Sequence, residues 1–201
     1  RYTQEIYYHA LNCGFRIPPS AGSASGVLPN PVGYNRCYVQ VGERLDYKSW
    51  WDRFAAGSVF VTNGPLLFIT ADGQLPGHVF RVESGQFRTT VRGRVQSIAG
   101  QRRHEMEFSA EIDCQRSGWF LVRALVDNDD TFRFASTGPF YVEIGQAEQP
   151  VNKRSANFFL TWAEERRAEL ADSLKENERE EVLVYHDQAI RFWNDLVRKA
   201  E

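Results

Sequence analysis

Metal-assisted hydrolysis is the first chemistry to test in this chain, because imidazoles and carboxylates are the side chains that hold a catalytic divalent ion. Tight spacings such as HxH or HExxH usually announce such a site. The chain has four histidines, and no two are close in sequence: His9, His78, His104 and His186. His186 falls on an apolar helical stripe, where a hydrogen-bonded core or interface histidine is favoured. The sequence therefore gives no recognisable metal-ligand set.

Charged residues cluster at two places. The string "DNDD", 127–130, offers three carboxylates to a cation such as calcium, but it lacks the glycine and distal glutamate of an EF-hand loop, so a hairpin turn is favoured. Five arginines lie on or just beyond one strand face: Arg88, Arg92, Arg94, Arg102 and Arg103. No aromatic residues interleave with them, and three glutamates of the next expected strand can pair across: Glu105, Glu107 and Glu111. A charge-paired outer face is favoured over an anion site.

Nucleophilic catalysis finds little support. Three serines lie in the loop "PPSAGSASG", but there is no GxSxG elbow: Ser20, Ser23 and Ser25. The three cysteines show no CxxC spacing, so we expect free thiols in the core: Cys13, Cys37 and Cys114. Free thiols are compatible with the cytoplasm and with other compartments.

Composition limits the partners. The chain has 201 residues, of which 42% are hydrophobic, and a net charge of −2, which predicts no general attraction to nucleic acid or to an anionic membrane. No apolar run approaches the roughly 18 residues that a membrane span needs. We therefore expect neither nucleic acid nor a membrane as a partner.

The periodicity predicts three regions and an α+β fold. Residues 1–66 alternate helix and strand, with a strand over about 35–41 and a helix capped by Asp46, as in an α/β unit too short to close a sheet. Residues 67–149 alternate with period two and predict an antiparallel β-sandwich of immunoglobulin-like type. Residues 150–201 predict a helical hairpin whose apolar face needs a partner, either the sandwich or another subunit.

A resemblance to a known family rests on three strings, "LNCGFRIPPSAGSASGVLPNPVGYNRCYV", "AGSVFVTNGPLL" and "GQLPGHVF". Together they resemble the C-terminal part of the PHP-type (polymerase and histidinol phosphatase) metal-dependent hydrolases, most closely the carbaryl-hydrolase-like branch, which includes bacterial proteins. The resemblance covers residues 1 to about 80, and "SGWFLVRALVDNDDTFRFASTGPFYVE" resembles the sandwich that follows. It implies that residues 1–66 are the last elements of a distorted α/β barrel, a barrel remnant whose upstream segment supplies the early metal ligands.

The departure from the family pattern bears on activity. The family has a Gly-Ser-Asp-Ser-His motif, and this chain reads Gly22-Ser23-Ala24-Ser25-Gly26. Ala24 and Gly26 cannot bind a metal, so we expect no metal ligands and no cofactor in this chain, with a divalent metal implied only for a full-length protein. Four residues of the loop and the turn that follows are candidates to line a substrate pocket: Ser23, Asn35, Arg36 and Asn63.

Two functions follow as hypotheses. The first is a C-terminal portion of a PHP-like metallohydrolase, not catalytic on its own, whose partners are the upstream barrel segment of the same protein and an unknown small-molecule substrate. The second is a non-catalytic binding or interaction module that uses the sandwich and the helical tail, through which a homo-oligomer can also form. Bound metal in the full-length protein favours the first hypothesis, and metal-free protein with tight ligand binding or self-association favours the second.

Overall fold

The computed structural model describes residues 2–99, 102–127, 131–145 and 150–200. The chain divides into two compact units, one of Arg1–Arg16 with Glu148–Glu201 and one of Ile17–Ala147. The α+β class predicted from the sequence is confirmed, with sandwich-like sheets and a C-terminal helical pair, and the described strands form no closed barrel.

Unit Ile17–Ala147 is built from three sheets. Its strands are β1 Arg36–Val39, β2 Val59–Thr62, β3 Leu66–Ala71, β4 Val79–Val82, β5 Phe87–Ala99, β6 Arg102–Cys114, β7 Gly118–Phe120, β8 Arg123–Val126, β9 Arg133–Thr137 and β10 Phe140–Ile144. The sheets have the orders β1-β2-β9-β8, β3-β5-β6 and β4-β10-β7, and only β4 and β10 among the named pairs run parallel. Buried side chains from all three sheets form one core cluster: Leu67, Ile69, Ala71, Val91, Ala135 and Phe140.

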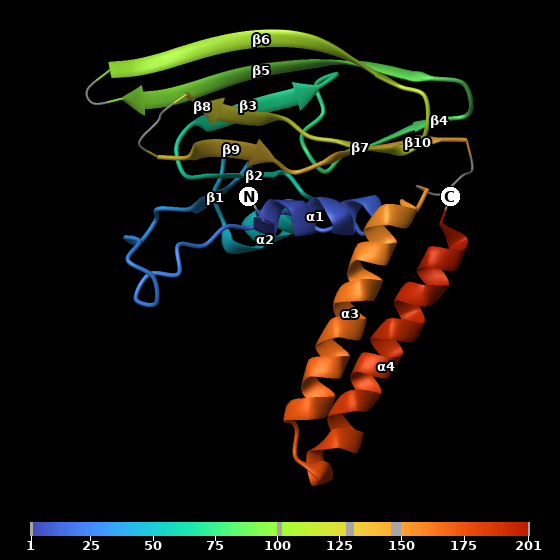
Figure 1. Ribbon diagram of the computed structural model, residues 1–201. Coiled ribbons are helices and arrows are strands. Elements are labelled where there is room, and N and C mark those ends of the chain that lie inside the picture. The colour runs from blue at the N-terminus through green and yellow to red at the C-terminus, as the bar shows by residue number, and fades with distance from the viewer. Residues whose placement is uncertain (1, 100–101, 128–130, 146–149, 201) are drawn as a thin grey trace. The chain divides into compact units, whose positions relative to one another are not determined.

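The period-two pattern of β5 is realised in the longest strand pair. β5 and β6 pair antiparallel over their whole length and run side by side across this unit (Figure 1). Phe87, Thr89 and Val91 of β5 are buried, as the alternation predicts. Gly93 continues this inward row where no side chain fits, since a Cβ there would lie 2.4 Å from Ile69 Cδ1 and 2.5 Å from Phe108 Cε1. The glycine therefore makes room for the Phe108 ring.

The strands of the first 66 residues join the sandwich. β1 pairs antiparallel with β2, and β2 pairs antiparallel with β9, so β2 lies between them. This pairing joins residues 36–62 to later strands of the chain in one sheet.

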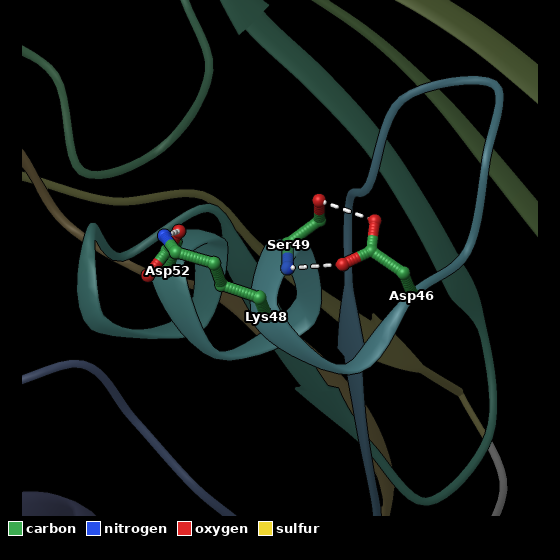
Figure 2. Close-up of polar contacts among 4 residues, drawn as sticks. All are labelled: Asp46, Lys48, Ser49 and Asp52. Carbon is green, nitrogen blue, oxygen red and sulfur yellow. Dashed lines mark hydrogen bonds and ion pairs between the residues drawn. The ribbon is translucent and has the colours of Figure 1, made fainter.

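Helix α2, Tyr47–Ala55, begins at the predicted cap. The Asp46 carboxylate accepts hydrogen bonds from Ser49 N at 3.0 Å and from the Ser49 hydroxyl at 2.6 Å (Figure 2). The first bond satisfies the Ser49 N–H, which has no backbone acceptor within the helix. Both bonds lower the pKa of Asp46 below its usual value. An ion pair between Lys48 and Asp52 adds a contact one turn apart (Figure 2).

Three glycines meet where the end of α2 approaches two later turns. Gly77 N donates to Pro139 O at 2.7 Å, and Gly138 N donates to Val59 O at 2.7 Å. A Cβ on Gly77 would lie 1.8 Å from Ala56 O, and one on Gly138 would lie 2.5 Å from Gly57 O. The backbones can approach this closely only without side chains. The glycines of "AGS", "PGH" and "TGP" therefore fix the path into β2, β4 and β10.

Replacing Gly77 tests this crossing. Gly73 is the matched control, because both residues have positive φ (+93° and +77°) but a Cβ on Gly73 meets nothing within 4 Å. We expect G73A to cost about 1–2 kcal/mol of unfolding free energy, from the backbone conformation alone. We expect G77A to cost at least about 2 kcal/mol more, from the clash. Urea unfolding measures both; equal losses would contradict the close approach.

The other unit is helical. It comprises α1 Tyr2–Asn12, α3 Lys153–Ser173 and α4 Glu176–Lys199. α3 and α4 form the predicted hairpin, held by an ion pair between Arg167 and Asp187 and by stacking of Phe159 on Trp193 at 4.6 Å. None of the described helices combines the length and apolar character that crossing a membrane requires.

Helix α1 provides a partner for one end of the hairpin. His9 stacks on Phe158 with ring centroids 4.2 Å apart, and its Nδ1 lies 2.9 Å from the buried Ser155 hydroxyl. Asn152, the cap of α3, donates its backbone N–H to Asn12 O at 2.9 Å. Part of the apolar face expected to need the sandwich or another subunit is therefore covered by the first helix of the chain.

Candidate functional site

The loop before β1 has a defined shape. The Ser23 hydroxyl accepts from Asn35 N at 3.0 Å and lies 3.3 Å from Asn35 O, to which it donates. The Asn35 side chain donates to Gly22 O at 3.1 Å, and Asn30 donates to Ser23 O at 3.4 Å. Ser23 and Asn35 thus close residues 23–35 into a loop whose ends are joined.

The backbone inside this loop adopts left-handed conformations at Ala24 and Gly26. Ala24 has φ +50° and Gly26 has φ +90°, and Val27 and Leu28 both donate backbone hydrogen bonds to Ala24 O. The loop also presents aliphatic side chains to solvent, with Val27 87% and Val32 90% exposed. Hydrogen bonds hold the backbone of the loop, while Val27 and Val32 remain almost fully exposed within this unit.

The two other pocket candidates lie beside the loop. Arg36 begins β1, is exposed, and has its guanidinium 6.0 Å from the centroid of the Tyr38 ring. Arg36 pairs with Thr62, which places the residue after Thr62, Asn63, at the same end of the two strands. The four candidates therefore gather around one end of β1 and β2, and their roles as pocket residues stay predictions.

The Asn63 side chain forms hydrogen bonds to the backbone next to and in β9, a role that the sequence did not indicate. It is buried; its side chain donates to Phe132 O at 2.9 Å and accepts from Phe134 N at 2.8 Å. Arg133 donates to Asn63 O at 2.7 Å. The side-chain amide of Asn63 thus extends the hydrogen bonding between β2 and β9 by one residue beyond the end of β2.

Removal of the Asn63 amide is expected to destabilise the sandwich. N63A leaves two backbone groups without their partner, which costs about 2–4 kcal/mol of unfolding free energy. N35A is the control, because the Asn35 side chain makes one exposed hydrogen bond, to Gly22 O. The hydrogen bonds between the Ser23 hydroxyl and the Asn35 backbone remain in this variant, so we expect the free energy of unfolding to fall by less than about 1 kcal/mol. Chemical denaturation measures both, and an equal loss would mean that Asn63 does not join β2 to β9.

The charged residues considered as ligand sites either form ion pairs with one another or do not converge. Arg88 pairs with Asp113 at 2.7 Å and Arg94 with Glu105 at 3.6 Å across β5 and β6, as expected for a charge-paired face. Of "DNDD", residues 128–130 lie outside the described residues, as do the side chains of Arg102 and Arg103. In the part of the chain that the structure describes, no three His, Cys, Asp or Glu residues converge as a metal site would require.

The three cysteines are free. Burial raises the pKa of Cys13 and of Cys37 to about 11, and burial together with the Asp113 carboxylate raises that of Cys114. The nucleophilic thiolate is therefore scarce in all three near neutral pH.

Alkylation should reveal this protection. We expect iodoacetamide at pH 8 to label Cys13 and Cys37 about tenfold more slowly in the folded protein than in denaturant, after allowing for the higher nucleophilicity of a more basic thiolate. The rates should rise as the pH approaches 11, because deprotonation supplies the reactive species. Mass spectrometry of the labelled peptides measures each site; equal rates in folded and unfolded chain would contradict the raised pKa values.

An apolar groove is the feature that sequence reasoning missed. A cavity of about 350 Å³ lies between β1, β2 and β3, in the size range of small-molecule sites. Tyr38 and Phe60 stack along it with centroids 5.0 Å apart, and Phe68, 43% exposed, lies on β3. Tyr38 and Phe60 are far apart in the sequence, and the pairing of β1 with β2 brings their rings together.

No family model matches the chain, and no curated protein or solved structure shows significant similarity to it. The geometry defines an α+β protein with a clasped loop at one end of β1 and an apolar groove along β1, β2 and β3. Functional assignment therefore depends on these two features and on the residues that form them.

Proposed function

We propose that this chain is the non-catalytic C-terminal portion of a PHP-like metallohydrolase, in which residues 17–35 pack against an upstream barrel segment of the same protein. The observation that carries the proposal is the loop itself, whose backbone is fixed by the Ser23–Asn35 clasp while Val27 and Val32 stay exposed. The resemblance of "PPSAGSASG" to the lip of a metallohydrolase pocket supplies the chemical class.

Physical reasoning supports a packed role for this loop. An ordered loop that exposes several aliphatic side chains is costly in water and is usually covered by another surface. Four such side chains are exposed here: Ile17, Val27, Leu28 and Val32. An upstream barrel segment packed on these four side chains would exclude water from the contact at the edge of the substrate pocket.

The division of labour follows from the residue types. Metal-bound water is the nucleophile of such hydrolases, and Ala24 and Gly26 supply no ligand to hold the ion. The upstream segment would hold the metal and bind the small-molecule substrate. Ser23, Asn35 and Arg36 would shape one side of the pocket, and Arg36 would attract an anionic or polar substrate group.

The test uses the longer protein, with its upstream segment, that the proposal requires. We expect it to contain a divalent metal and to hydrolyse members of a panel of ester, amide and phosphate substrates. V27D with V32D should lower that activity at least about tenfold by placing charges in the packed surface, and should leave the unfolding of the present chain nearly unchanged.

L125D is the control, because Leu125 is an exposed aliphatic residue of β8 outside residues 17–35. It should leave hydrolysis intact. A longer protein without metal or hydrolytic activity, or one whose activity is indifferent to both loop changes, would contradict the proposal.

The second hypothesis, a binding or interaction module, is favoured by one observation, the groove beside Tyr38, Phe60 and Phe68. It requires no metal and no second segment. Self-association through the helical tail stays a prediction; Trp162 and Phe192 are about half exposed on that hairpin.

A further inference from the structure

Two cavities meet within unit Ile17–Ala147, and their chemistry differs. The apolar groove of about 350 Å³ lies along Tyr38, Phe60 and Phe68. A second cavity of about 480 Å³ adjoins it, since Ser58 and Pro76 line both. Three aromatic rings and a larger number of aliphatic residues line the first cavity, so an apolar group that includes a ring matches it.

Basic residues line the second cavity. Arg53, His78 and Arg81 line it, and no carboxylate is among its lining residues. Glu143 pairs with Arg81 at 2.8 Å, whereas Arg53 makes no ion pair with any carboxylate in the described ranges. An anionic group placed there would gain an ionic partner in Arg53.

Ser58 lies at the junction. It is 5% exposed, its backbone N–H donates to Arg53 O, and its carbonyl accepts from Gln40 N. Its hydroxyl makes no hydrogen bond among the described residues, and its oxygen is not one of the buried side-chain atoms left without a partner. The hydroxyl is therefore open to the cavities that Ser58 lines and can donate to a ligand there.

We infer that these joined cavities form a binding site for a small arylalkyl carboxylate. The ring would lie against Tyr38, Phe60 and Phe68, the Ser58 hydroxyl would donate to the carboxylate or a polar group near it, and Arg53 would supply the opposite charge. This site lies apart from the loop 17–35 and needs no metal, so it goes beyond the proposed function and stands or falls independently of it.

The experiment titrates the present chain with 4-phenylbutyrate and, in parallel, with the neutral 4-phenylbutan-1-ol, followed by 15N chemical shifts. We expect both to shift amides of β1, β2 and β3, and the carboxylate to bind about threefold to fivefold more tightly than the alcohol. F68A should weaken the binding of both ligands about fivefold, because it removes one of the three aromatic rings that would contact them.

Charge variants separate the two ends of the site. R53Q should remove the preference for the carboxylate and leave the alcohol unaffected. R92Q is its control, since Arg92 is an exposed arginine of β5 outside both cavities, and should change neither affinity. M106A, an exposed apolar residue of β6, is the control for F68A.

Several outcomes would overturn the inference. These are shifts that map outside β1, β2 and β3, equal binding of acid and alcohol, an R53Q protein that keeps the preference, or no shifts at millimolar ligand. These outcomes concern ligand binding by the present chain and say nothing about metal binding or hydrolysis by a longer protein. The failure of this inference can therefore be distinguished from the failure of the proposed function.

Discussion

The hydrogen-bonding of β2 to two neighbours is the constraint on which the other features depend. β2 pairs with β1 on one side and with β9 on the other, and the buried Asn63 amide extends that pairing to Phe132 and Phe134. One edge of β2 thereby holds β1, which carries the clasped loop and Tyr38. The glycine crossing at Gly57, Gly77 and Gly138 sets where β2 begins, next to the Ser58 junction of the two cavities.

This arrangement separates a loop with a fixed shape from a groove with defined chemistry. The loop is closed by polar contacts at its base and exposes aliphatic side chains at its tip, which suits contact with another protein surface. The groove is largely apolar and adjoins a second cavity lined by Arg53 and Arg81, which suits a small amphiphilic ligand. The loop and the groove both adjoin β1, but they use different residues and suit different partners, so one protein can have both.

Local pattern explains which parts of this fold were predictable. The inward row of β5, the cap at Asp46 and the two tail helices follow from spacings within a few residues, and each is found. The pairing of β2 with β9 depends on register between segments far apart in the chain, and no short-range signal carries that information. For the same reason α1 as partner of α3, and the role of Asn63, emerged only from the structure. Ser23 and Asn35 were predicted as neighbours of one pocket, and their mutual clasp is the part that the structure adds.

These 201 residues position a loop and a groove, and we expect that they do not themselves hold a catalytic ion. Metal analysis by mass spectrometry, on the chain purified without chelator and then dialysed against zinc or manganese, tests this directly. The account predicts well below one equivalent of divalent metal per chain. One tightly held equivalent, retained through gel filtration, would contradict it.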